Sequence, residues 1–327
     1  METGASVPWL ASYQVLTDRW GIVDLSSRSR VELTGADRVQ FLNGFCTNDI
    51  KLLGPGQGCE AFLTNHQGRI AGHVYVRMLS DSLVLDSAPG QAAAIIQHLD
   101  RFVISDRVEF RDLSDLTGEL LLAGKESPAL LGTVCGEPPP EGLWSHAART
   151  FSGISVSVQR VPYASEASFF LTTPKESLAV VEKALLAAGG SLGEPAAVEA
   201  ARIEAGVPLY GRDITLDNLP QEIGRNAQAI SFTKGCYLGQ ETVARIDALG
   251  HVNRLLVGVR FSGDEGPAPG LELVFGDKTV GQVTSACWSP RLKAPLAFAL
   301  LRRQQAAPGT CLSSPLGPAE VVSLPLG

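Results

Sequence analysis

Residues 59–86 read CEAFLTNHQGRIAGHVYVRMLSDSLVLD. Segments 59–64, 70–78 and 83–86 of this stretch are short, rich in apolar residues and separated by turn-forming residues, which is typical of β-strands joined by short connections. We predict a strand at 30–33 and a helix at 36–45 before this stretch, and a helix at 91–102 after it. This order indicates one α+β unit.

The same order recurs further along the chain. We predict a strand at 119–123, a helix at 127–134, strands at 142–148, 154–159 and 169–171, and a helix at 175–188. Leu178, Val181 and Leu185 of the last helix recur at helical spacing. The repeat predicts two interlocked α+β units of ferredoxin-like order, with a central groove where their sheets meet. Such grooves are common ligand sites.

The last quarter of the chain has a different pattern. A helix at 196–205 leads to a turn at 211–213, and beyond residue 251 strands are predicted at 254–261, 271–275, 279–287 and 295–302, without a helix between them. This favours a small C-terminal β-barrel. With 327 residues, two or three domains are expected. We place their boundaries at 1–115, 116–251 and 252–327.

Composition excludes several classes of protein. The formal charge is −7 and the basic residues are scattered, which argues against direct nucleic-acid binding. Neither a signal-peptide pattern nor an apolar run of membrane-spanning length is present, so we expect a cytoplasmic protein without membrane association. The six cysteines include no C-x-x-C pair, which argues against a structural zinc site or a permanent metal. A monomer is the default.

One cysteine has an unusual sequence context. Cys236 lies between Lys234 and the start of a short helical pattern, and both a nearby ammonium group and a helix N-terminus favour thiolate over thiol. Gly235 would allow a sharp turn that leaves one side of the sulfur uncovered. Glu241 falls in the first helical turn, where negative charge is favoured. The alternative is that Cys236 is a small buried apolar residue.

The stretch Lys234-Gly235-Cys236-Tyr237-Leu238-Gly239-Gln240-Glu241 resembles the signature of the YgfZ family. These folate-binding proteins of iron–sulfur cluster assembly and repair are related to the aminomethyltransferase of glycine cleavage. Three further blocks, at 35–49, 202–211 and 281–290, resemble the same family in the expected order. The resemblance implies an aminomethyltransferase-like fold: two α+β units and a barrel around a central groove.

The resemblance also implies a function. It predicts a tetrahydrofolate-binding accessory protein whose partners are iron–sulfur client or assembly proteins, including cluster-dependent enzymes that modify tRNA. Cys236, activated by Lys234, would ligate iron transiently or form a mixed disulfide with a client. Gly235 and Gly239 would shape the loop. Tyr237, Gln240 and Glu241 complete the loop motif, and the last two would anchor it or meet a partner.

Folate binding calls for an apolar slot and a carboxylate that accepts two N–H bonds from the pterin. Tyr163 and Glu166 match the Tyr-x-x-Glu that holds the pterin in aminomethyltransferases, although the glycine-rich surroundings are missing. Arg202, Glu204 and Tyr210 have helix and turn positions compatible with lining the same cavity, and Asn48 is a further expected folate-binding residue. The alternatives are a solvated loop carboxylate at Glu166 and a surface ion pair between Arg202 and Glu204.

Gly72-His73 stands where aminomethyltransferases carry Asp-Asp. A neutral imidazole does not supply the fixed negative charge that stabilises an iminium-like cation, so this departure argues against aminomethyl transfer. We expect His73 to be a half-exposed strand residue. Whether the protein is an enzyme stays open: a folate-dependent aminomethyl or other one-carbon transferase is one alternative. A cysteine-based redox or hydrolytic enzyme is the other, with His251 the nearest histidine to Cys236 in sequence.

Overall fold

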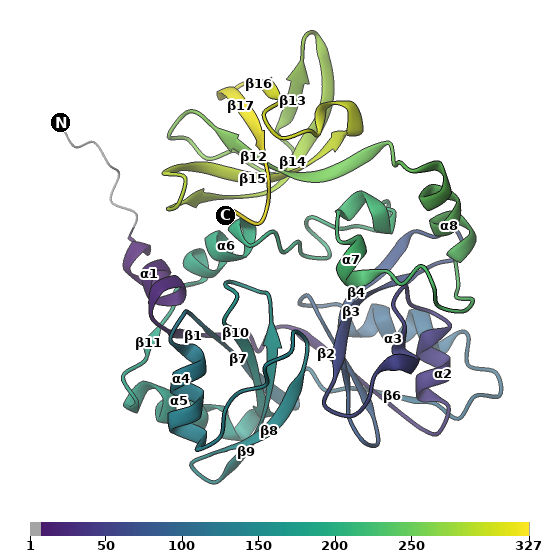
Figure 1. Cartoon of the computed structure of the whole chain (residues 1–327), viewed down its shortest axis with the longest axis vertical. Helices are drawn as coiled ribbons and strands as arrows, with labels where there is room; N and C mark the ends of the chain where they lie inside the picture. The colour runs from purple at the N-terminus through teal and green to yellow at the C-terminus, as the bar shows by residue number, and fades with distance from the viewer. Residues whose placement is uncertain (1–7, 327) are drawn as a thin grey trace.

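The computed structural model describes residues 8–326. Figure 1 shows two α+β units side by side and a β-barrel above them. The sheet of the first unit has the order β3 (Gly58–Thr64), β4 (Ile70–Met78), β5 (Leu83–Ser87), β2 (Ser29–Thr34), β6 (Glu109–Asp112). Helices α2 (Arg38–Asn43) and α3 (Ala92–Asp100) pack on one face, because alternate apolar residues of the strands, such as Val74 and Val76, face the same core.

The second sheet repeats this order. It runs β8 (His146–Phe151), β9 (Ile154–Val161), β10 (Ser168–Pro174), β7 (Thr117–Ala123), β1 (Gly21–Asp24), β11 (Ser191–Leu192), with α4 (Ser127–Cys135) and α5 (Leu178–Ala187) on its outer face. The place that β6 takes beside β2 is taken here by β1, which pairs antiparallel with β7. Because β1 precedes the whole first unit in sequence, the two units are interlocked.

The barrel is closed by six strands. Their order is β12 (Arg254–Phe261), β15 (Ala294–Arg302), β14 (Lys278–Ser289), β13 (Glu272–Phe275), β16 (Cys311–Ser314), β17 (Gly317–Val322). Alternate inward residues, such as Val259 and Phe261, fill its interior. The predicted α+β class with two units and a C-terminal β-barrel is confirmed.

Connecting helices join these parts. α6 (Pro195–Glu204) packs against both α1 (Leu10–Asp18) and β14, so it links the second unit to the barrel. The other connections are η1 (Ile50–Leu52), η2 (Lys175–Ser177), η3 (Pro220–Ile223), α7 (Asn226–Ala229), α8 (Gln240–Leu249) and η4 (Arg303–Gln305). Between residues 8 and 326, no helix is long and apolar enough to cross a membrane.

The structure corrects several details of the prediction. The strand expected at 142–148 lies at 146–151, because residues 142–145 form a turn. Helix 36–45 is shorter, at 38–43, with Asp37 at the N-cap position but bonded through its carboxylate to Arg107, and Gly44 at the C-cap position. β1, β6, β11, β16 and β17 were not predicted. The boundary at 115/116 stays a prediction, and β1 crosses it by pairing with the second sheet.

Candidate functional site

The loop before α8 is fixed to the first unit by Lys234. Its ammonium group donates hydrogen bonds to the carbonyl oxygens of Asn43 (2.8 Å), Cys46 (2.7 Å) and Asn48 (2.7 Å). These use all three of its N–H groups. Burial lowers the pKa of Lys234, and the nearby Cys46 thiol, 4.0 Å away, opposes that shift. The geometry makes Lys234 an anchor of the loop, and its action on Cys236 stays a prediction.

A second anchor follows Cys236. The amide of Leu238 donates to the Gly44 carbonyl (2.9 Å), and the Leu238 carbonyl accepts from Thr64 Oγ1 (2.6 Å). Gly239 has φ +80°, and a Cβ there would lie 2.3 Å from the Asn65 carbonyl oxygen. The start of α8 therefore sits directly on the turn between β3 and β4. Tyr237 is buried, with its ring centroid 5.0 Å from the Lys234 ammonium nitrogen.

Cys236 is exposed between these two anchors, so the alternative of a buried thiol is wrong. The left-handed glycine of the loop is Gly239, not Gly235, which corrects the sharp turn expected at Gly235. A Cβ at Gly235 would meet nothing within 4 Å. The surface beside the sulfur is therefore open, and Glu241 is exposed in the first turn of α8 with Gln240 half-buried before it.

A cavity of about 860 Å³ opens between α1, the 160–167 loop, α6 and the C-terminal end of the chain. Glu166 lines it from the loop, is exposed, and its carboxylate forms no hydrogen bond or ion pair with the described residues. Tyr163 is buried nearby, in edge contact with Phe170 (5.2 Å between ring centroids). The Arg28 guanidinium lies 5.4 Å from the Tyr163 ring.

Glu204 also lines this cavity, and it is already engaged. Its carboxylate accepts hydrogen bonds from the hydroxyl groups of Tyr13 and Ser289. Burial, together with the bond to Glu204, raises the pKa of Tyr13. The Glu204 side chain is therefore fixed in the lining of the cavity, whereas Glu166 keeps both carboxylate oxygens open to N–H donors of a ligand. Asp18, the other acidic residue of the described lining, pairs with Lys125 through Oδ1.

The other predicted folate residues lie elsewhere. Arg202 is buried and binds Glu199, Asp213 and the Val207 carbonyl. The alternative of a surface ion pair between Arg202 and Glu204 is wrong, because both side chains are buried and each has other partners. The Tyr210 hydroxyl donates to the Ile70 carbonyl (3.3 Å). The Asn48 amide donates to the Glu60 and Gln228 carbonyls, bridging β3 and α7.

His73 is not half-exposed, as expected from the sequence, but buried. Its Nε2 lies 2.8 Å from Glu60 Oε1, and Arg225 donates to both oxygens of the same carboxylate. Burial alone would raise the pKa of Glu60, but Arg225 and His73 outweigh it and lower the pKa to about 2. Glu60 is therefore ionised, with its charge matched by Arg225. The network was not predicted from the sequence. A Glu and a His within strands that are otherwise apolar could have indicated a buried polar pair.

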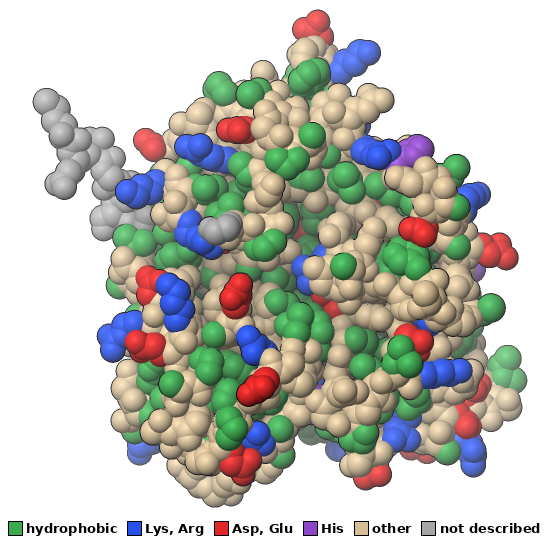
Figure 2. Space-filling view, viewed as in Figure 1, with side chains coloured by type: hydrophobic (Ala, Val, Ile, Leu, Met, Phe, Trp, Pro, Cys, Tyr) green, Lys and Arg blue, Asp and Glu red, His purple; other side chains and the backbone are tan. Residues whose placement is uncertain are grey.

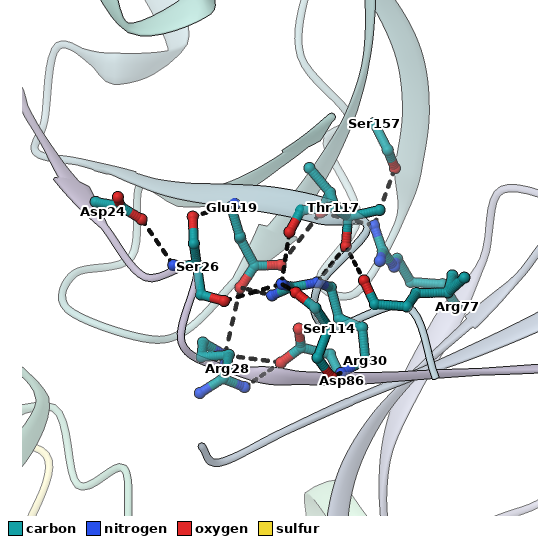
Figure 3. Close-up of polar contacts among 12 residues, drawn as sticks. Asp24, Ser26, Arg28, Arg30, Arg77, Asp86, Ser114, Thr117, Glu119 and Ser157 are labelled. Carbon is teal, nitrogen blue, oxygen red and sulfur yellow. Dashed lines mark hydrogen bonds and ion pairs between the residues drawn. The ribbon is translucent and has the colours of Figure 1, made fainter. Parts of the chain in front are cut away.

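A second buried network joins the two units (Figure 3). Arg28 Nε donates to Asp86 Oδ1 (2.8 Å) and lies 3.4 Å from Glu119 Oε1, while Arg77 Nη1 reaches Thr172 Oγ1 (3.0 Å) of the second sheet. Burial and the negative charge of Asp86 raise the pKa of Glu119 to about 8. Together with the surrounding aromatic rings, this network fills the contact between the sheets. Arg28, Asp86 and Glu119 are not among the residues that line the 860 Å³ cavity.

Neither of these networks has the donor set of a metal site. Within residues 8–326 no group of three or more His, Cys, Asp and Glu side chains is arranged to hold a metal ion. In Figure 2, Lys and Arg side chains are interspersed with Asp and Glu over the visible face, without a large basic patch. The distribution on this face lacks the clustered positive charge that phosphate backbones attract.

Comparison with known proteins places the chain in a family. Residues 5–234 match the GCVT N-terminal domain, and residues 254–326 match the glycine cleavage T-protein C-terminal barrel domain. The chain therefore belongs to the glycine cleavage T-protein (GCVT) family.

Several relatives in this family are named aminomethyltransferases. That of Mycobacterium tuberculosis is 31% identical over 86% of this chain and 77% of its own. That of Streptomyces coelicolor is 29% identical over 94% of this chain and 86% of its own. The crystal structure of the glycine cleavage system aminomethyltransferase T from Bartonella henselae shares the fold, with a TM-score of 0.88 over 97% of this chain and 89% of that one, at 22% identity.

Proposed function

We propose that the protein binds tetrahydrofolate in the 860 Å³ cavity and acts through Cys236 as an accessory factor in the assembly or repair of iron–sulfur proteins, including enzymes that modify tRNA. The observation that carries this proposal is the presentation of Cys236. An exposed thiol stands between two anchors, Lys234 and Leu238, that fix the loop to the first unit. Such a rigid, open thiol suits reaction with a partner protein rather than with a small molecule enclosed in a pocket.

The cavity suits a folate in size and chemistry. Its volume falls within the roughly 300–1,000 Å³ of ordinary ligand sites. Tetrahydrofolate, when bound, supplies a pterin with an N–H donor edge and an amine that carries one-carbon units. The unpartnered Glu166 carboxylate would accept two of the pterin N–H bonds. Glu204, held by Tyr13 and Ser289, would bound the site and exclude water from its floor.

Cys236 has two routes of action. A thiolate is a soft ligand, so it can bind iron for the time of a transfer. It can also attack a client disulfide, forming a mixed disulfide and releasing the second client sulfur as a thiolate. The open surface at Gly235 serves both routes, because a partner approaches the sulfur without displacing a side chain.

A folate-dependent one-carbon transferase is the second candidate, favoured by the names of the relatives. The network at His73 counts against it. His73 is directed to Glu60 and the charge of Glu60 is matched by Arg225, so this network offers no unbalanced carboxylate to stabilise a developing cation. Formation of methylene-tetrahydrofolate from an aminomethyl donor would favour the transferase instead.

The test combines binding and function. Calorimetric titration with tetrahydrofolate is expected to show binding to the wild type and weaker binding to Glu166→Ala, with Glu265→Ala on an exposed barrel loop as the control. Cys236→Ser is expected to bind folate normally but to lose support of iron–sulfur client enzymes in cells. Cys311→Ser, which removes another exposed thiol, is expected to keep both properties. Normal client activity with Cys236→Ser would overturn the role of this cysteine.

A further inference from the structure

The C-terminal tail, residues 323–326, separates two cavities. Pro325 lines both the 860 Å³ cavity and a second cavity of about 250 Å³ under the barrel. Leu326 lines the first cavity and Leu324 lines the second. Among residues 8–326, both cavities also share Ala205, which follows α6. Figure 1 shows this end of the chain next to α6, between the barrel and the α+β units.

Among the described residues, the tail makes fewer hydrogen bonds than the strand before it, and its Leu324 and Leu326 side chains pack against the hydrophobic cluster between α6 and the barrel. β17 ends at Val322, opposite Gly258 of β12. Beyond it, two hydrogen bonds connect the tail to the rest of the described chain: the Leu326 amide donates to the Glu204 carbonyl (2.8 Å), and Arg291 Nη1 donates to the Leu326 carbonyl (3.1 Å). Ser323 and Pro325 are exposed. A segment with few hydrogen bonds and exposed backbone opens more readily than a paired strand.

Leu324 nevertheless occupies a shaped slot. A Cβ at Gly258 would lie 2.7 Å from Leu324 Cγ, and a Cβ at Gly206 would lie 3.3 Å from Leu324 Cβ. Two glycines on different elements therefore make room for this one side chain. The seated tail is a defined closed state of the molecule.

The lining of the second cavity is connected to the Cys236 loop by hydrogen bonds. Arg225 and Gln228 line it. The Gln228 carbonyl accepts from the Asn48 amide, and the Asn48 carbonyl accepts from Lys234. Hydrogen bonds thus connect the wall of this cavity to the anchor of the exposed cysteine.

We propose that the tail is a displaceable plug. When it is seated, the two cavities are separate, and when it leaves, they join into one passage that admits an extended ligand with a flat head group and a flexible chain. The identity of that ligand as a folate rests on the proposed function, whereas the movement of the tail does not.

The first experiment traps the tail. In the double variant Gly206→Cys/Leu324→Cys the Cβ atoms would stand near the separation of about 3.5–4.5 Å found in disulfides. We expect tetrahydrofolate to associate at least about tenfold more slowly with the oxidised form than with the same protein after reduction, because binding then requires a blocked rearrangement. Equal association rates in the two forms would overturn the plug.

The second experiment needs no folate and avoids a side chain at Gly206, which has φ +71°. In the single variant Leu324→Cys, the rate of labelling by a small thiol reagent is compared with those of exposed Cys311 and buried Cys46 in the same molecule. If the tail is displaceable, we expect the thiol introduced by Leu324→Cys to be labelled more slowly than Cys311 and faster than Cys46. Labelling as fast as Cys311 means that the tail never closes, and labelling as slow as Cys46 means that it leaves only on unfolding. Either outcome rejects the plug, even if the wild type binds no folate.

Discussion

Lys234 and Cys236 are two residues apart, but the structure gives them different environments. Lys234 is buried and holds three carbonyl groups of the 43–48 loop, whereas Cys236 is exposed. The motif therefore combines a structural residue and a chemically available one.

This difference predicts opposite effects on stability. Lys234→Met removes the ammonium donor from the buried carbonyls of Asn43 and Cys46 and leaves the half-buried Asn48 carbonyl with only the Cys46 thiol, so we expect it to lower the free energy of unfolding by about 2–4 kcal/mol. Cys236→Ser should change it by less than about 0.5 kcal/mol, as is usual for an exposed site. Urea unfolding measures both, with Lys51→Met at an exposed lysine as the control. If Lys234→Met were as stable as the control, Lys234 would not anchor the loop.

At the residue scale, the sequence showed which chemical groups are present but not where they point. The spacing of Lys234 and Cys236 predicted an effect of the ammonium on the thiol, which stays a prediction, but it did not show that the ammonium binds the carbonyls of Asn43 and Cys46. For the same reason His73 was expected to be half-exposed, since its partners Glu60 and Arg225 come from distant segments. The cavity position of Glu166 was accessible to prediction because it rests on a local motif.

Among the elements, the start of α8 depends on one glycine. Gly239→Ala would force a Cβ to 2.3 Å from the Asn65 carbonyl at φ +80°. We expect a loss of about 2 kcal/mol or more. Gly235→Ala, four residues earlier in open space, should be tolerated. Thermal unfolding of the two variants provides the comparison, and equal melting temperatures would show that α8 does not need this close contact.

β8 contributes a pH dependence to the contact between the units. His146 Nε2 lies 3.0 Å from the Met78 carbonyl at the end of β4, and burial, with the charge of Arg77, lowers the pKa of His146 to about 4. Between this value and its unfolded value near 6.5, the unfolded state binds more protons. His146 therefore makes the free energy of unfolding fall as the pH decreases from about 6.5 to about 4, by at most about 3 kcal/mol.

The contribution of His146 is the difference in free energy of unfolding between the wild type and His146→Gln at each pH. Gln is chosen because its side-chain amide is able to donate to the Met78 carbonyl. Glu119, with its raised pKa, acts in the opposite direction in both proteins and cancels in the difference. Urea unfolding of both proteins at several pH values should show a steeper acid loss in the wild type. If the free energy of unfolding had the same pH dependence in the two proteins, His146 would not titrate between about pH 4 and about pH 6.5.

Prediction of the elements depended on their length and pattern. β4 and β12 were placed at their observed bounds because each is long and rich in apolar residues. β1, β11, β16 and β17 are short, and their apolar residues are too few to show a period. Such short strands are stabilised by hydrogen bonds to neighbouring strands of the sheet or barrel, and at least one neighbour of each comes from a distant part of the sequence.

For the whole molecule, Arg202 connects α6 to the barrel. It pairs with Asp213, and Asp213 Oδ1 accepts from Thr284 and Ser285 of β14. Arg202→Met leaves a buried carboxylate without its cation, which costs about 3–5 kcal/mol. We expect the barrel to separate from the rest at a lower temperature, giving two transitions in calorimetry. Arg212→Met, which removes an exposed partner of Glu199, is the control and should keep the wild-type profile.

At this scale the sequence predicted the class of fold, and the binding of a ligand in a groove between the units stays a prediction. The actual lining of the cavity required the folded chain, because α1, Arg291 and the tail come from opposite ends of the sequence and none carries a recognisable motif. The position of the cavity follows from how the barrel sits on α6, a matter of packing between distant surfaces.

The position of β1 in the second sheet has a consequence for folding during translation. β1 leaves the ribosome before the first unit, but its partner β7 follows only after that unit is complete. The nascent chain must therefore carry an apolar strand with unpaired edges while β2–β6 fold, and such edges invite pairing with other chains. A fragment ending at residue 115 would keep β1 but lack its partner β7, so we expect such a fragment to expose an unpaired strand edge.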